Sequence, residues 1–195
     1  MDGLIYFQQN IINSIETKQA LLRDEAALSG ILKASELCLA AYRRGNKVMI
    51  AGNGGSAADS QHIAAEFVSR FEFDRPGLPA LALTTDTSIL TAIGNDYGFE
   101  KLFARQIQAN AQVGDIFIGI STSGNSKNIL AAMIQAKSMG LTTVGLAGSG
   151  GIIADYCDIC IRVPSSHTPR IQESHILIGH MICGYVEQEY FSDRA

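Results

Sequence analysis

The sequence alternates short apolar runs with longer segments of helical periodicity, and this rhythm limits the fold more than any other feature. Runs rich in β-branched and aliphatic residues predict five strands, at 48–51, 80–83, 116–120, 142–146 and 159–163. Between them, apolar residues recur every three or four positions, which predicts helices at 56–70, 102–111 and 125–139. This order of elements is typical of a parallel sheet with helices on both faces.

The two ends of the chain are predicted to be helical. Residues 4–44 carry leucines at helical spacing, so we expect two helices there that pack against a partner chain. Residues 171–191 have the same periodicity and predict a long terminal helix. The expected fold class is α/β, a three-layer sandwich with a five-stranded, mainly parallel sheet flanked by helices, plus N-terminal helices for oligomerisation.

The length and composition favour one compact unit. A chain of 195 residues fits one domain, which we divide into N-terminal helices at 1–45 and an α/β core at 46–195. Hydrophobic residues make up 47% of the chain, enough for a core and for an apolar surface that self-associates. The net charge of −4 and the absence of a Lys/Arg block argue against nucleic-acid binding.

Targeting and cysteine patterns are also informative. No apolar run is long enough for a transmembrane helix, and residues 1–18 lack the pattern of a signal peptide, so we expect a cytoplasmic protein without membrane contact.

Cys38 and Cys183 lie in apolar helical patterns and are expected to be buried thiols. Cys157 and Cys160 form a Cys-x-x-Cys that leads into an apolar run instead of opening a helix, which disfavours a redox or zinc site.

Two loops follow predicted strand ends, where ligands bind in open α/β sheets. The loop at 52–56 reads Gly-Asn-Gly-Gly-Ser, so backbone N–H groups can approach a ligand, and Ser56 is expected to cap the next helix. An ordinary strand-to-helix turn is the alternative. A relaxed dinucleotide fingerprint also fits here, but no acidic partner for a ribose follows. The loop at 121–126, Ser-Thr-Ser-Gly-Asn-Ser, precedes a helix and is interpreted as a phosphate cradle.

One helical turn separates His62 from Glu66, so their side chains share a face just beyond the first loop. A general base beside a metal ligand would have this arrangement. A solvated polar pair on a helix surface would have it too. The neighbouring glycine loop favours the first interpretation.

The terminal helix carries side chains of the kind that bind metals among its apolar residues. Gln172 and His180 are eight residues apart, or about 12 Å along a straight helix, so they can share one ion only if it lies between their turns. His175 is the geometric competitor. A mainly buried helix otherwise has little use for two histidines.

Several separated motifs together resemble one family. They are Ala51 to Asp59, Gln61-His62, Glu66, Gly94 to Gly98, Ser121 to Ser126, and Arg170 to Glu173 with His175. In this order they resemble the phosphoheptose isomerases, which have a sugar isomerase (SIS) domain, over most of the chain. The resemblance implies a flavodoxin-like sandwich, a homotetramer with sites at subunit contacts, and conversion of sedoheptulose 7-phosphate to D-glycero-D-manno-heptose 7-phosphate. That step begins the route to lipopolysaccharide or related surface heptoses.

The resemblance also implies roles for individual residues. The implied zinc ligands are His62, Glu66, Gln172 and His180. The implied substrate contacts are Asn53, Gly54, Gly55, Glu66, Asn95, Asp96, Ser121, Thr122, Ser123, Ser126 and Gln172. Aldose-ketose isomerisation moves a proton between adjacent carbons through an enediol, and Glu66 and His180 are the candidates for this work. Zinc or another divalent ion would polarise the carbonyl.

Two non-catalytic alternatives use the same scaffold. The chain also resembles a DnaA-associating regulatory protein, a tetramer that binds a replication initiator. That relative is expected to lack counterparts of Glu66 and His180, which are present here, so the enzyme is favoured. A sugar-phosphate-sensing module would use the serine loop but would not need the His, Glu and Gln side chains.

Overall fold

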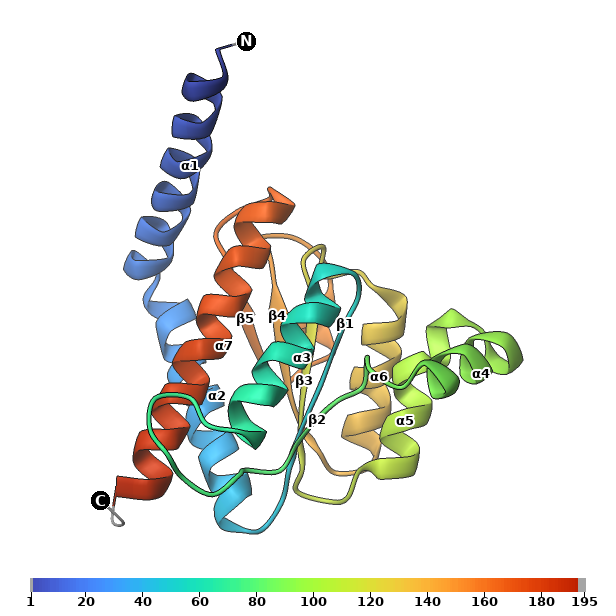
Figure 1. Ribbon diagram of the computed structural model, residues 1–195. Helices are drawn as coiled ribbons and strands as arrows, with labels where there is room; N and C mark the ends of the chain where they lie inside the picture. Colours follow the sequence, from blue (N-terminus) through green and yellow to red (C-terminus); the bar gives the residue numbers. More distant parts are fainter. Residues whose placement is uncertain (1, 193–195) are drawn as a thin grey trace.

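The computed structural model describes residues 2–192, whose elements form three layers (Figure 1). The strands are β1 Val48–Gly52, β2 Ala80–Ala82, β3 Ile116–Ser121, β4 Thr142–Ala147 and β5 Ile159–Arg162. They pair in the order β2-β1-β3-β4-β5, and every pairing is parallel. The predicted fold class is confirmed, and this order is that of flavodoxin-like sheets.

The helices confirm the predicted elements and add one. They are α1 Gly3–Arg23, α2 Glu25–Arg43, α3 Gly55–Val68, α4 Thr87–Tyr97, α5 Leu102–Asn110, α6 Lys127–Ser138 and α7 Thr168–Phe191, with short 3-10 helices at Phe99–Lys101 and Ile153–Asp155. The sequence did not predict α4. Its start is fixed by Asp86, whose side chain accepts a hydrogen bond from the Ile89 N–H at 2.8 Å.

Side chains alternate between the two faces of the sheet and so divide the core. In β1, Val48 and Ile50 pack beneath α2, α3 and α7, whereas Met49 and Ala51 pack with α5 and α6. All five residues of β1 are buried. The sheet is therefore covered on both faces, which explains why its strands are continuous apolar runs.

The N-terminal end of the first helix projects beyond the rest of the molecule (Figure 1), while the helix contacts α2 and α7. Only Thr17 and Leu21 of α1 are buried. Its large exposed apolar residues include Leu4, Ile5, Phe7, Ile11, Ile12 and Ile15. An apolar surface of this kind is typical of a protein interface. Although α1 has 21 residues, no helix within 2–192 is both long and apolar enough to cross a membrane.

The four cysteines are free thiols. Cys38 and Cys183 are buried in the core that contains α2 and α7, as predicted. Cys157 and Cys160 belong to the opposite core, near β4 and β5.

Candidate active site

The loop after β1 lies where α3 and α7 approach each other. Gly54 has φ 56°, a left-handed conformation that favours glycine, and it is the N-cap residue of α3. The prediction that Ser56 caps this helix is wrong, because α3 already begins at Gly55 and Ser56 is buried inside its first turn. A Cβ atom on Gly55 would overlap the side-chain amide of Gln172. Two predicted substrate-binding segments, separated by more than half of the chain, therefore meet here.

The serine loop connects β3 to α6. The Ser121 hydroxyl lies 2.9 Å from that of Ser126 and 3.5 Å from that of Ser123. The Asn125 N–H donates to the Ser123 oxygen at 3.2 Å, and the Gly148 N–H donates to the carbonyl of Thr122 at 3.1 Å. Ser126 is the N-cap residue of α6, without a side-chain cap bond. Three hydroxyls thus gather at a helix N-terminus, an arrangement suited to an anion.

Two asparagines link the loop after β1 to the first turn of α6. Asn53 donates from its amide nitrogen to Oδ1 of Asn128 at 2.9 Å, and Asn128 donates back to Oδ1 of Asn53 at 2.8 Å. The order of the sheet reverses between β1 and β3, so both loops lie at the topological switch point. Open α/β sheets bind ligands at this position.

A cluster of potential metal ligands lies between α3 and α7. Nε2 of His62 is 2.8 Å from Oε1 of Glu66, and a ligand atom from each of His62, Glu66 and His180 lies within 4.8 Å of the others. Nε2 of His180 is buried and has no hydrogen-bond partner among the described residues. Bonds of about 2 Å to one zinc ion would place ligand atoms about 3 to 4 Å apart. The three side chains therefore fit a divalent ion with little rearrangement.

Two further candidates on α7 are His175 and Gln172. His175 is fully buried and is not part of this cluster. Burial lowers the pKa of His175 to about 4, and the nearby backbone of Ala147 raises this pKa by a smaller amount. Neither ring nitrogen has a hydrogen-bond partner among the described residues. Gln172 lies against Gly55, and its role as a metal ligand stays a prediction.

Asn95 and Asp96 lie on α4, at a distance from the cluster. The Asn95 amide donates to Oδ1 of Asp96 at 2.8 Å, and both side chains are exposed. No residue of α4 is buried, and this helix packs mainly on α5 and on the 3-10 helix Phe99–Lys101. Figure 1 shows α4 and α7 on opposite sides of the molecule. A single chain therefore does not bring these two residues to His62, Glu66 and His180, and their role stays a prediction.

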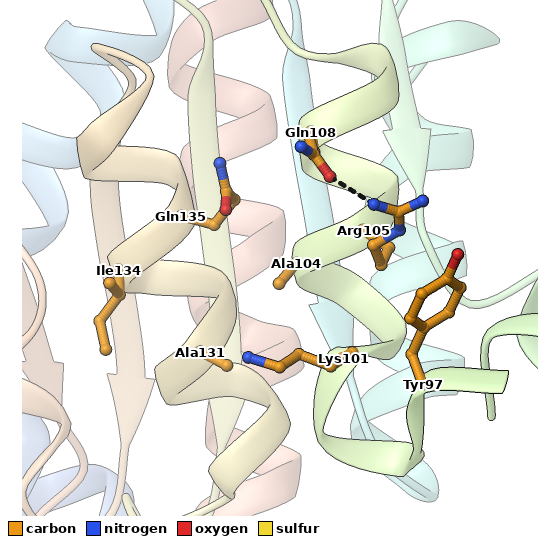
Figure 2. Close-up of a pocket in the computed structure, with 8 residues that line it drawn as sticks. All are labelled: Tyr97, Lys101, Ala104, Arg105, Gln108, Ala131, Ile134 and Gln135. Carbon is orange, nitrogen blue, oxygen red and sulfur yellow. Dashed lines mark hydrogen bonds between the residues drawn. The ribbon is translucent and has the colours of Figure 1, made fainter.

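Surface hollows help to locate the site. One of about 330 Å³ lies beside His180 and is lined by Phe71, Glu72 and α7. Another, of about 360 Å³, lies between α5 and α6 (Figure 2), where Arg105 donates to Gln108 at 2.9 Å. None of the predicted site residues lines the second hollow. Of these two hollows, only the first borders a member of the metal-ligand cluster.

Two residues at the cluster were not predicted. Asp59 lies one turn before His62 on α3. Burial raises the pKa of Asp59 to about 6, and His62 lowers this pKa by a smaller amount. Its spacing from His62 was the available signal. The ring of Phe71 stacks on His180, with centroids 5.4 Å apart and an interplanar angle of 30°. Phe71 lies in an irregular segment, where no periodic pattern could have indicated it.

Curated proteins and family models confirm the resemblance suggested by the motifs. The model of the SIS domain matches residues 11–148. The chain is 60% identical over 190 residues to a phosphoheptose isomerase of Aneurinibacillus thermoaerophilus. The aligned region covers 97% of this chain and 96% of that protein. It is also 60% identical to phosphoheptose isomerase 2 of Campylobacter jejuni, over 95% of this chain and 93% of that one.

Solved structures agree with the sequence comparison. A phosphoheptose isomerase from Francisella tularensis is similar with a TM-score of 0.92 and 36% identity, over 96% of this chain and 100% of that one. The enzyme of the same name from Neisseria gonorrhoeae gives a TM-score of 0.89 and 40% identity, over 95% and 98% of the two chains. The chain therefore belongs to the SIS domain family and, within it, to the phosphoheptose isomerases.

Proposed function

We propose that the protein is an aldose-ketose isomerase that converts sedoheptulose 7-phosphate to D-glycero-D-manno-heptose 7-phosphate through an enediol. This would be the first step of ADP-heptose synthesis for lipopolysaccharide or a related glycoconjugate. The observation that carries the proposal is the cluster of His62, Glu66 and His180, in a chain 60% identical to a phosphoheptose isomerase. Neither the DnaA-associating regulator nor the sensing module needs this cluster, and no observation favours them.

The serine loop is the proposed phosphate site. Its three grouped hydroxyls and the N-terminus of α6 can donate to a phosphate dianion. The sugar would extend from there across the β1–α3 loop, where Gln172 meets Gly55. The full set of proposed substrate contacts is Asn53, Gly54, Gly55, Glu66, Asn95, Asp96, Ser121, Thr122, Ser123, Ser126 and Gln172.

Glu66 and His180 are the proposed acid and base. The reaction removes a proton from the carbon beside the carbonyl and returns one to the neighbouring carbon, while protons also move between the two oxygens. His62 holds the carboxylate of Glu66 by a 2.8 Å contact, which fixes its orientation. Nε2 of His180 has no partner among the described residues and is free to exchange a proton or bind a metal.

His62, Glu66, Gln172 and His180 are the proposed ligands of one zinc ion per subunit, with another divalent ion as an alternative. A bound ion would polarise the carbonyl oxygen of the substrate. The donor set of imidazoles, a carboxylate and an amide oxygen suits zinc, and the amide favours modest affinity. His62 and His180 pack edge to face, with ring centroids 5.0 Å apart, which limits how far either imidazole can turn from the other.

A homotetramer with sites at subunit contacts is part of the proposal. The exposed apolar residues of α1 support self-association. Asn95 and Asp96 lie far from the metal cluster within one chain, which supports a site completed between subunits. The cytoplasmic location and the single domain spanning 1–195 stay predictions, and residues 1 and 193–195 lie outside the described part of the chain.

The direct test is turnover. Purified, zinc-supplemented protein is incubated with sedoheptulose 7-phosphate, and formation of the aldose is followed by NMR. We expect product that depends on protein and is lost after treatment with a chelator. No product from folded, zinc-loaded protein would contradict the proposal, and an initiator-protein pulldown would then test the regulatory alternative.

A further inference from the structure

An ion pair between Arg75 and Glu187 is buried beside the candidate active site. Arg75 belongs to the irregular segment 69–79, between α3 and β2, and Glu187 belongs to α7. Nε of Arg75 donates to Oε1 of Glu187 at 2.7 Å, and the two side chains are only 2% and 1% exposed. Burying two charges is unfavourable unless their remaining hydrogen-bonding capacity is also satisfied. The further partners of both groups therefore indicate what the pair holds in place.

Arg75 binds the end of α3. Its terminal nitrogens donate to the carbonyls of Glu66 at 2.8 Å and Phe67 at 2.6 Å, and also to those of Ser69 and Pro76. The last carbonyls of a helix lack partners inside the helix, and a cation at this end also interacts favourably with the helix dipole. Arg75 thus fixes the last turn of α3, which carries Glu66.

Glu187 binds the segment that passes over α7. Its carboxylate accepts the Phe71 N–H at 2.8 Å and the Glu72 N–H at 2.6 Å, in addition to Arg75. Burial alone raises the pKa of Glu187, but these three donors outweigh it and lower the pKa below its ordinary value. The ionised carboxylate therefore determines where the backbone of Phe71 and Glu72 lies.

The ring of Phe71 transmits this placement to His180. His180, Gly184 and Glu187 are four and then three residues apart, so they share one face of α7. A Cβ atom on Gly184 would lie 3.3 Å from Cε1 of Phe71, so the ring rests directly on the glycine. The ring also stacks on His180. Phe71 is held between Glu187 at its backbone and His180 at its ring.

We propose that Arg75 and Glu187 are positioning residues that set the relative placement of Glu66 and His180. The pair acts on Glu66 through the last turn of α3 and on His180 through Phe71. It contacts backbone groups and the partner charge, so neither residue is assigned a chemical step. The inference rests on the proposed function, because it concerns the same cluster of ligands and acid/base groups.

A second ion pair with a buried carboxylate provides a control. Nζ of Lys47 lies 2.6 Å from Oδ2 of Asp115, which is fully buried and also accepts the backbone N–H groups of Lys47 and Gln112. This pair lies where β1 and β3 begin, at the opposite ends of these strands from the ligand loops. Breaking it should destabilise the fold without changing the geometry of the cluster.

The experiment compares Glu187→Gln with Asp115→Asn in the full-length, zinc-loaded protein, well below the unfolding temperature of both. Zinc affinity is measured by competition with a chelator. Amide hydrogen exchange is followed at Phe71 and Glu72, and NMR of the product gives kcat and KM. We expect Glu187→Gln to weaken zinc binding by about tenfold, to accelerate exchange at both amides, and to lower kcat more than it raises KM. Asp115→Asn should keep zinc affinity and kcat within about twofold of the wild type.

A second variant addresses the case in which Glu187→Gln does not fold. Gly184→Ala keeps the ion pair and adds a methyl group against the Phe71 ring, so it should displace the ring and weaken zinc binding in the same direction. Wild-type zinc affinity and kcat in every folded variant would overturn the inference. Equal losses in Glu187→Gln and Asp115→Asn would also overturn it. Wild-type protein that binds zinc without isomerising sedoheptulose 7-phosphate would contradict the proposed function alone, since affinity and exchange still decide the inference.

Discussion

The imidazole of His62 and the carboxylate of Glu66 meet across one turn of α3, with Nε2 2.8 Å from Oε1. This contact directs the carboxylate towards the ring of His180, where the three potential ligands converge. The side chain of His62 is itself 50% exposed, whereas that of Glu66 is 21% exposed. The position of Glu66 thus accounts for both of its proposed roles, as a ligand and as a base.

Glu66→Gln is expected to lower kcat by about 10²-fold to 10⁴-fold while the protein stays folded, because the amide has nearly the same volume but cannot accept the proton. NMR of the product gives kcat, and circular dichroism reports the fold. Glu189→Gln, on the exposed side of α7, is the control and should behave as the wild type. A near-normal kcat in Glu66→Gln would rule out Glu66 as the base.

The two histidines of α7 should respond differently to substitution. His180→Ala is expected to lose both bound zinc and activity, because it removes a member of the cluster. His175→Ala should keep its zinc and lose about 1 to 3 kcal/mol of stability, because it removes a buried core side chain. Metal content after dialysis and urea unfolding measure the two effects. The reverse pattern would move the ligand to His175.

His175 also predicts a pH dependence of stability. Its pKa in the folded protein is lowered to about 4 by burial, whereas an unfolded histidine has a pKa of about 6.5. Between these values the unfolded chain binds a proton that native His175 does not. The neutral His175 therefore makes its full contribution to the free energy of unfolding above pH 6.5. This contribution, about 3 kcal/mol at most, is lost as the pH falls towards 4. Urea unfolding at several pH values gives the slope of stability against pH, which should be smaller in His175→Gln than in the wild type. Equal slopes would contradict a lowered pKa of His175.

The serine loop can be tested through KM. Ser121→Ala and Ser126→Ala each remove a hydroxyl from the proposed phosphate site and should raise KM for the phosphorylated substrate by about tenfold, with a smaller effect on kcat. Ser138→Ala, on the exposed last turn of α6, is a matched control that should leave KM unchanged. If neither loop variant alters KM, the phosphate binds elsewhere.

The first helix should determine the oligomeric state. Deleting about the first 25 residues removes the exposed apolar residues of α1 and is expected to dissociate the proposed tetramer. Light scattering measures the mass in solution. Val113→Ser removes another highly exposed apolar side chain, 77% exposed, and should not change the mass. A truncated protein that stays tetrameric would show that other surfaces hold the subunits together.

Most of the fold could be predicted because its strands are buried on both faces and read as apolar runs. The exception is α4, whose sequence contains Thr87, Thr91 and Gly94, residues of low helix propensity. Its helix depends on the cap at Asp86 and on packing against α5, neither of which has a periodic signature.

The site was predictable only in part. His62 and Glu66 could be paired from their spacing, because they lie on one turn of one helix. His180 was linked to them by resemblance to a family, since nothing local places α7 against α3. Arg75 and Glu187 gave no signal at all, because 112 residues separate them and each, taken alone, has the appearance of a solvated charge.

The cluster joins side chains at positions 62 and 66 to one at position 180, on the last helix of the described chain. Ribosomes release a chain from its N-terminus, so β1 and α3 can fold together long before α7 has been made. A chain still being synthesised therefore carries two of its four proposed ligands on a helix whose partner does not yet exist. The proposed metal cluster can therefore form only after α7 has been made, and a chain truncated before α7 would lack two of its four proposed ligands.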